Sequence, residues 1–270
     1  MPKVKVGDIN IYYEVHGKGE PLVMIPGSAS SVGGFFMHIP VFSREYQVIA
    51  FDPRGAGRSD APDITYTMEM MADDLAGLLY AISIDSAHIL GASMGGLIAQ
   101  QFVLRHPKRV RSLILVCTSC GGPHSVITTD PEILEMYQHP KDLPPKEMFR
   151  QNFPLMASRE YINNNSGLIT QIIEKFMEYP APPQGQMRQT QALMAHDTYN
   201  HLSEIKAPTL IISGDADRAL PVQNSRIMAS RIPGAELVIL KNAGHLLIEA
   251  GDEPNRIMLD FLRRHRTKKA

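Results

Sequence analysis

Ser93 stands between glycines in the stretch from residue 88 to residue 100, HILGASMGGLIAQ, where an apolar run ends and an amphipathic run begins. Gly91 and Gly95 suit a tight turn between a strand and a helix, because such a turn leaves little room for side chains. The turn could serve only to join the two elements. It could also be a nucleophile elbow, which projects the serine hydroxyl above a sheet for attack on a carbonyl group.

A nucleophilic serine needs a base that takes its proton and an acid that holds the base. Where an elbow carries the serine, the acid and then the histidine follow it along the chain. The C-terminal part of the sequence offers His245 and His265. His265 lies among cations at the end of a predicted helix, where a solvated role is expected. His245 lies in the loop NAGHLLIEA directly after an apolar strand, where chemistry commonly resides, so we predict that it is the base.

Two aspartates, Asp215 and Asp217, follow a predicted strand in the segment IISGDADRALP. Either carboxylate could hold the histidine, and Asp215 could instead bind the backbone of its own turn, a common use of aspartate after glycine. One predicted helix and one predicted strand separate this segment from His245, enough chain to cross the sheet and return beside its start. These patterns leave the choice of acid open.

Length and composition describe an ordinary globular protein with small-molecule partners. The chain has 270 residues, 44% hydrophobic and 20% charged, and a formal net charge of -1. This balance gives no electrostatic reason to expect nucleic acid or an anionic membrane as a partner. The N-terminal segment MPKVKVGDIN has no apolar core of a signal peptide, and no apolar run approaches a membrane span, so we expect a cytoplasmic protein. The oligomeric state is left open.

Cys117 and Cys120 form a C-x-x-C pair, CTSC, which could indicate redox chemistry. Cys117 closes an apolar strand and Cys120 precedes a Gly-Gly-Pro turn, without the surrounding pattern of a thioredoxin-like unit. We therefore interpret both as small buried apolar residues.

The elements that must position the candidate residues alternate between strand and helix. Apolar runs predict strands over residues 3–6, 9–17, 21–27, 46–52, 87–92, 110–117, 207–215 and 235–241, and helical spacing predicts helices over 67–82, 94–107, 222–232 and 253–265. Residues 122–201 are rich in proline and methionine and contain helical segments without a convincing strand. We expect an α/β core formed by residues 1–121 and 202–270, with a mostly parallel sheet covered on both faces, and a helical insertion between its two parts.

Four motifs in order resemble those of the α/β-hydrolase superfamily, in the capped branch that includes esterases, enol-lactonases, cofactor-free haloperoxidases and carbon-carbon bond hydrolases. They are FDPRGAGRSDAP, GASMGG, PTLIISGDADRALP and NAGH. The resemblance implies the α/β-hydrolase fold, an eight-stranded sheet with a helical cap, and a catalytic triad. It assigns the nucleophile to Ser93, the base to His245, and the acid to Asp217 rather than Asp215.

Two backbone N–H groups are expected to bind the oxyanion that forms when the serine attacks. Met94 follows the elbow at the N-terminus of the predicted helix, where the helix dipole favours negative charge. By resemblance, the second donor comes from the loop IPGSAS, with Ser28 as the implied residue. The family usually has His-Gly in this loop, and here Pro26 stands in the place of the histidine.

No metal or organic cofactor is implied. The histidines lack ligand spacing, and GAGRSD lacks the third glycine and the helical continuation of a dinucleotide-binding loop. We therefore interpret Asp52, Arg54, Gly55 and Gly57 as structural.

The insertion, which by resemblance caps the sheet, is expected to select the substrate. Its methionines and phenylalanines could line an adaptable apolar pocket, or form only the core of the cap; the candidates are Met148, Phe149, Phe153, Met177 and Met194. A substrate carboxylate could bind one of three arginines, although each could equally be a solvated helix charge: Arg150, Arg159 and Arg188.

The sequence favours a serine hydrolase that cleaves a small, largely apolar ester or lactone. The same triad could instead serve carbon-carbon bond hydrolysis, perhydrolysis or acyl transfer. The chain contains no tryptophan, whereas carbon-carbon hydrolases of this branch commonly carry one next to the catalytic histidine. A ligand receptor of low turnover on the same scaffold is the alternative from another functional class.

Overall fold

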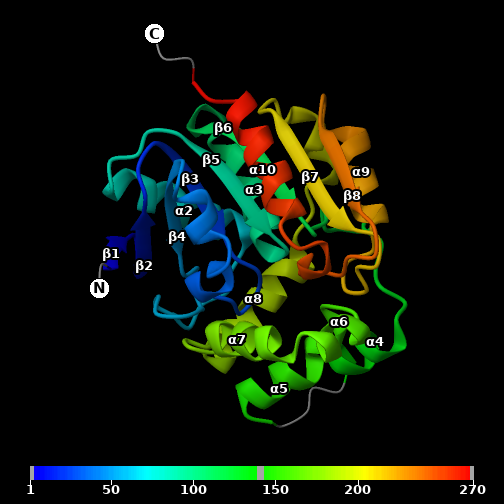
Figure 1. Ribbon diagram of the computed structural model, residues 1–270. Coiled ribbons are helices and arrows are strands. Elements are labelled where there is room, and N and C mark those ends of the chain that lie inside the picture. The colour runs from blue at the N-terminus through cyan, green and yellow to red at the C-terminus, as the bar shows by residue number, and fades with distance from the viewer. Residues whose placement is uncertain (1–2, 139–142, 268–270) are drawn as a thin grey trace.

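An eight-stranded sheet forms the centre of the molecule (Figure 1). The structure is a computed structural model and is described for residues 3–138 and 143–267. The strands lie in the order β1-β2-β4-β3-β5-β6-β7-β8. Strands β3 to β8 run parallel to one another, and β2 pairs antiparallel with both β1 and β4. Their bounds are β1 (Lys3–Val6), β2 (Ile9–His16), β3 (Glu20–Ile25), β4 (Tyr46–Phe51), β5 (Ala87–Ala92), β6 (Val110–Val116), β7 (Thr209–Gly214) and β8 (Glu236–Leu240).

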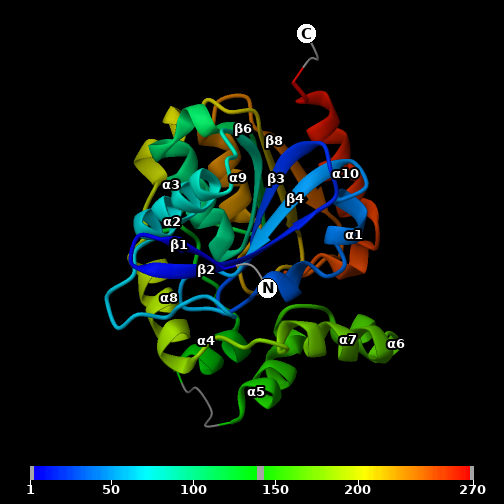
Figure 2. The same cartoon turned by 90° about the vertical axis from the view of Figure 1, so that its left-hand side faces the viewer.

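Helices cover the sheet on both faces, as the parallel strands require, because nearly every residue of β3, β5 and β7 is buried. One face carries α2 (Met68–Ala81), α3 (Met94–Arg105) and α9 (Gln223–Arg231), and the other carries α1 (Ile39–Phe42) and α10 (Glu253–Arg264) (Figure 2). Two large apolar clusters fill the spaces between the sheet and these two helical layers. The mostly parallel, doubly covered sheet expected from the sequence is confirmed.

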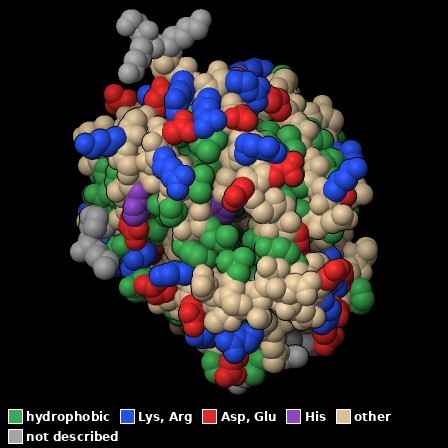
Figure 3. Space-filling view, in the orientation of Figure 1, with side chains coloured by type: hydrophobic (Ala, Val, Ile, Leu, Met, Phe, Trp, Pro, Cys, Tyr) green, Lys and Arg blue, Asp and Glu red, His purple; other side chains and the backbone are tan. Residues whose placement is uncertain are grey.

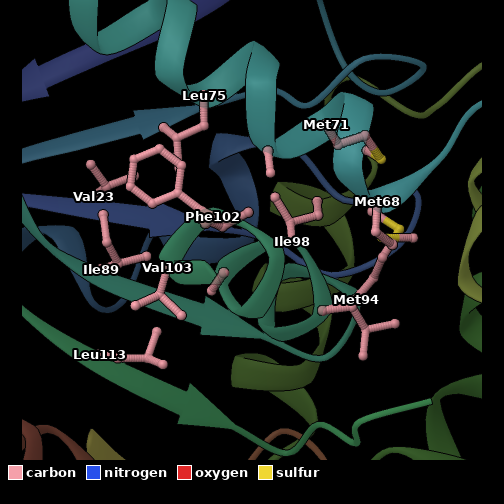
Figure 4. Close-up of a cluster of buried hydrophobic side chains, with 14 of the residues drawn as sticks. Val23, Met68, Met71, Leu75, Ile89, Met94, Ile98, Phe102, Val103 and Leu113 are labelled. Atoms are coloured by element: carbon pink, nitrogen blue, oxygen red, sulfur yellow. The ribbon is translucent and has the colours of Figure 1, made fainter. Parts of the chain in front are cut away.

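The larger cluster joins α2 and α3 to the sheet directly behind the elbow (Figure 4). Phe102, on α3, is fully buried in it. Side chains that Figure 4 labels come from three strands and both helices: Val23, Met68, Met71, Leu75, Ile89, Met94, Ile98, Phe102, Val103 and Leu113. Burying side chains of this size stabilises the fold by about 2 kcal/mol each, so α3 is firmly fixed on the sheet.

Between β6 and β7 the described residues form helices and no named strand. These are α4 (Pro131–Gln138), α5 (Pro145–Asn152), α6 (Arg159–Asn164), α7 (Ser166–Phe176) and α8 (Pro183–Ala195). Figures 1 and 2 show them gathered beside the carboxyl ends of the parallel strands, and we call this group the cap. Short 3-10 helices complete the chain: η1 (Val32–Phe35), η2 (Pro107–Arg109), η3 (Phe153–Leu155), η4 (Tyr199–Glu204) and η5 (Ile248–Ala250).

Helix α8 contacts the core through two glycines. Gly55, in the loop after β4, has a φ of +81°, and a Cβ atom built on Gly185 would lie only 2.2 Å from its carbonyl oxygen. The backbone of α8 therefore lies directly on that loop.

The other residues of the loop after β4 hold the core together. Arg54 is buried and pairs with Asp74 at 2.6 Å and with Asp8 at 2.9 Å, and Asp52 accepts a 2.7 Å hydrogen bond from the N–H of Val32. These contacts agree with the structural role expected for this segment.

None of the described helices combines the length and the apolar character that a membrane crossing would need.

Candidate active site

Ser93 lies at a sharp turn between β5 and α3. Its φ of 53° and ψ of -122° are strained for a residue with a side chain, and such strain is characteristic of a nucleophile elbow. Cβ atoms added to the flanking glycines would collide with backbone, 2.3 Å from the oxygen of Gly95 for Gly91 and 2.1 Å from the oxygen of Ile25 for Gly95. The missing side chain of Gly91 therefore lets the chain fold back on the first turn of α3, and that of Gly95 lets the turn fit against β3.

Asp217 and His245 meet across the loops that follow β7 and β8. The Nδ1 atom of His245 lies 2.8 Å from Oδ2 of Asp217, and the Asp217 side chain is fully buried. The other carboxylate oxygen, Oδ1, accepts the backbone N–H groups of Ala219 and Leu220, each at 2.9 Å. The carboxylate is thus held on both sides, which fixes the ring of His245.

Asp215 has a different role from Asp217. It is exposed, and its Oδ1 atom accepts the N–H of Asn242 at 2.7 Å. That bond ties the loop after β7 to the loop that carries His245. The choice that the residue pattern left open therefore has a geometric answer, because it is Asp217 that touches the histidine.

The environment of His245 favours its protonated form. Burial is the largest single influence and lowers its pKa, but the charge and the hydrogen bond of Asp217 together outweigh burial, so the pKa is raised above 6.5. An imidazolium is thus stabilised at this position, as a base that must carry a proton during a reaction requires.

Ser93 and His245 lie at the same edge of the sheet, in the segments that follow β5 and β8. The N–H of Ser93 donates to the carbonyl of Val116 at 2.9 Å, and the next residue, Cys117, lies beside Asp217 and His245. In the part of the chain that the structure describes, neither Oγ of Ser93 nor Nε2 of His245 has a hydrogen-bond partner. Both atoms are therefore available to a substrate, and such contacts commonly tighten only when one binds.

The N–H groups of Ser28 and Met94 also donate to no acceptor among the described residues. Met94 is the first residue of α3. A Cβ atom on Gly27 would lie 3.3 Å from Cβ of Ser93, so the loop that carries Ser28 lies against the elbow. Two free donors near one serine hydroxyl can bind a developing oxyanion.

Cys117 is a neighbour of the site that the sequence did not indicate. Its φ is +44°, and its sulfur lies within 4.8 Å of one side-chain atom of Asp217 and one of His245. Burial, followed by the charge of Asp217, raises the pKa of this thiol well above its ordinary value. One sulfur, one nitrogen and one oxygen could hold a metal ion. Because the hydrogen bond between Asp217 and His245 already uses two of these groups, we interpret the cluster as an acid-base pair beside a neutral thiol.

The cap residues proposed for the pocket divide into two groups. Phe153 is buried in an apolar cluster that Phe149 and Met177 join, and Leu246 and Ile248 from the histidine loop pack against it. Met148 is half-buried, whereas Met194 is 75% exposed on α8 and lies away from this cluster. Figure 3 shows hydrophobic side chains gathered over the boundary between the core and the cap. Apolar surface thus adjoins the residues that follow His245.

The three candidate arginines do not converge on the site. Arg188 is buried and binds Asp63 and the carbonyl of Pro62. Arg159 pairs with Glu132 at 2.9 Å, and Arg150 is exposed. No arrangement for a substrate carboxylate is evident among these described side chains.

Known proteins share this fold. A family model described as alpha/beta hydrolase fold matches residues 20–252. The chain belongs to the alpha/beta hydrolase fold family.

Three known proteins illustrate the range of those that resemble this chain. A protein of Stutzerimonas stutzeri named "Putative carbamate hydrolase RutD" is 28% identical over 93% of this chain and 96% of its own length. A 2-hydroxy-6-oxononadienedioate/2-hydroxy-6-oxononatrienedioate hydrolase of Burkholderia vietnamiensis is 30% identical over 95% of this chain and 92% of its own. Among solved structures, a thermophilic esterase from Thermogutta terrifontis superposes with a TM-score of 0.84 at 26% identity, covering 99% of this chain and all of that one.

Proposed function

We propose that this protein is a serine hydrolase that cleaves a small, largely apolar carboxylic ester or lactone through an acyl-enzyme on Ser93. The observation that carries the proposal is the 2.8 Å hydrogen bond between Asp217 and His245, at the same sheet edge as a serine in a strained elbow. Membership of a family of hydrolases supports hydrolytic activity as the coarser statement.

In the first half of the reaction, Nε2 of His245 takes the proton of Ser93 as Oγ attacks the substrate carbonyl carbon. The carbonyl oxygen becomes an oxyanion and accepts hydrogen bonds from the N–H groups of Met94 and Ser28. Asp217 stabilises the imidazolium that forms. His245 then donates its proton to the leaving alcohol oxygen, and the acyl group remains on Ser93.

In the second half, water replaces the alcohol. His245 takes a proton from the water, the hydroxide attacks the acyl carbon, and a second oxyanion forms on the same two N–H groups. Collapse of this intermediate releases the carboxylic acid and returns the proton to Ser93.

The apolar cluster of the cap supports an apolar substrate. Leu246 is the residue next to His245, Ile248 is the third residue after it, and both pack against this cluster. The acyl or alcohol part of a bound ester would therefore meet apolar side chains. The name of the Burkholderia vietnamiensis relative describes a substrate with two carboxylates, which calls for cationic partners. Arg159 is paired with Glu132 and Arg188 with Asp63, which weighs against a substrate with two carboxylates here.

Carbamates are the second candidate class, since the Stutzerimonas stutzeri relative carries that name. A carbamate carbonyl can be attacked by the same serine and stabilised by the same N–H groups. Carbon-carbon cleavage, perhydrolysis and acyl transfer would use the same residues. A ligand receptor on this scaffold would bind its ligand without turnover by these residues.

Hydrolysis of p-nitrophenyl esters with acyl chains of two to twelve carbons tests the proposal, beside a p-nitrophenyl carbamate and the variants Ser93→Ala and His245→Ala. We expect ester hydrolysis that both substitutions reduce by about 10³-fold or more, with the best chain length reporting the size of the pocket. A wild type no faster than its variants on every ester would overturn ester hydrolysis, and faster cleavage of the carbamate would select the second class.

A further inference from the structure

Gln189 is a buried side chain of the cap that reaches the core beside the elbow. It lies on α8, and its side chain is fully inaccessible to solvent. Its Oε1 atom accepts the N–H of Ala29 at 2.8 Å, and its Nε2 atom donates to the carbonyl of Arg54 at 2.8 Å. One amide thus joins the cap to two separate loops of the core.

The loop that Gln189 holds is the one that presents the N–H of Ser28. Ala29, the next residue, has a φ of +57°, a conformation that a residue with a side chain adopts only when its surroundings hold it there. The hydrogen bond from Ala29 to Gln189 is the external contact that fixes this peptide unit.

A second hydrogen bond sets the direction of the Ser28 N–H group. The N–H of Ser30 donates to the carbonyl of Gly27 at 3.3 Å, which closes a turn over residues 27–30. In a trans peptide the N–H of Ser28 points opposite to the carbonyl of Gly27. With that carbonyl engaged in the turn, the Ser28 N–H faces away from it and remains unpaired, on a loop that lies against Ser93.

The position of Gln189 is itself fixed by a backbone contact. Gly185, four residues earlier on the same face of α8, packs directly on Gly55. Docking of the cap helix therefore determines where the Gln189 amide lies. The loop has Pro26 where the family usually has a histidine, and its residue Ala29 is bonded to the cap through Gln189.

We propose that Gln189 is a positioning residue for the oxyanion-binding loop, so that the cap helps to assemble the catalytic site as well as the pocket. The inference rests on the proposed function, because it assigns the N–H of Ser28 to oxyanion binding. Gln189 touches neither substrate nor nucleophile. Its effect passes through the Ser28–Ala29 peptide to the transition state.

Gln189→Met tests this role, because methionine fills a similar volume without the amide. Gln191→Met is the matched control, since Gln191 lies on the same helix and is exposed. For p-nitrophenyl ester hydrolysis we expect kcat of Gln189→Met to fall about 10- to 100-fold with KM changed less than about twofold, as for loss of part of an oxyanion site. Gln191→Met should match the wild type.

A trifluoromethyl ketone gives a readout that a purely structural role would not produce. Such a ketone adds to the serine and forms a hemiketal oxyanion that resembles the reaction intermediate. Its inhibition constant should rise in Gln189→Met by about the same factor as kcat/KM falls. Gln189→Asn serves as a second variant should methionine destabilise the cap, because it keeps a buried amide that is too short to reach both partners. We expect kcat/KM of Gln189→Asn to lie between those of the wild type and Gln189→Met.

An unchanged kcat in both Gln189→Met and Gln189→Asn would overturn the role of Gln189. A loss of activity with an unchanged ketone inhibition constant would do the same. These outcomes differ from failure of the proposed function. In that case the wild type itself would neither hydrolyse the esters nor bind the ketone.

Discussion

The pairing of a buried carboxylate with a histidine determines the chemistry of this site at the scale of single residues. Asp217 is fixed by two backbone N–H groups and in turn fixes His245, whose pKa it raises against the opposing effect of burial. As the proposed base, His245 can take a proton only when its ring is neutral, so we expect activity to rise as pH increases through that pKa.

Asp217→Asn tests this electrostatic relation. We expect the acid limb of kcat/KM to have its midpoint above pH 6.5 in the wild type, in accord with the raised pKa. In the variant the carboxylate charge is lost while burial remains, so the midpoint should move below that of the wild type. The rate at neutral pH should fall by about 10³- to 10⁴-fold. A pH-rate profile measures both effects. Asp215→Asn, beside the site, should leave the midpoint unchanged.

The residue types and their order could be predicted from the sequence, and several contacts could not. Ser93, Asp217 and His245 occupy loops that follow predicted strands, and motifs record such local geometry. Gln189 meets Ala29 across 160 positions of the chain, and Cys117 lies beside His245 through the order of the strands. Hydrophobic periodicity describes which face of an element is buried, but it does not specify which distant residue lies against that face.

At the scale of elements, close backbone contacts place the loops and the cap. The elbow fits against β3 because Gly95 has no side chain, and it folds back on α3 because Gly91 has none. Helix α8 lies on the loop after β4 because Gly55 and Gly185 have no side chains. The predicted core strands and helices correspond to elements of the structure. Within residues 122–201 the sequence indicated helical segments, but the helices α5 and α6 are short and largely polar, so few apolar residues mark them.

Gly185→Ala tests the contact between the cap and the core. The added methyl group would lie 2.2 Å from the Gly55 oxygen, so α8 must shift. We expect the free energy of unfolding to fall by at least about 2 kcal/mol, together with a loss of activity through displacement of Gln189. Gly167→Ala on α7 is the control, because its new methyl group would meet nothing within 4 Å. Denaturant unfolding should show that this control is as stable as the wild type or up to about 1 kcal/mol more stable.

At the scale of the whole molecule, the parallel strands bring three distant segments to one edge. Ser93, Asp217 and His245 follow β5, β7 and β8, and ligands of open α/β sheets bind at the carboxyl ends of their strands. Alternation of strands and helices could predict this edge. The strand order could be expected only through the family resemblance, and the cap boundaries at residues 122 and 201 stay predictions.

A buried histidine at the junction of cap and core makes the stability of the whole fold depend on pH. His196 follows α8, is 4% exposed, and its Nδ1 atom has no partner among the described residues. Burial lowers its pKa from 6.5 to about 4. As pH falls between these values, the unfolded chain binds a proton that the folded chain does not, so stability is lost.

We expect His196 to contribute about 3 kcal/mol to the loss of folding free energy over this range of pH. Denaturant unfolding at pH 7 and pH 4 should show a smaller pH dependence for His196→Asn than for the wild type. His88 and His38 are shifted in the same direction and remain in the variant, so part of the dependence should persist. The exposed His201→Asn is the control, and an equal change in both variants would contradict a special role for His196.

The central claim is that Ser93 carries the acyl group, and a pre-steady-state burst experiment tests it most directly. Wild-type protein mixed with a slight excess of a p-nitrophenyl ester and quenched in acid within milliseconds should yield a burst of nitrophenol. Mass spectrometry should then show one acyl group on the peptide that contains Ser93, which Ser93→Ala should lack. Rapid nitrophenol release that Ser93→Ala retains, with no acyl group on that peptide, would contradict the account.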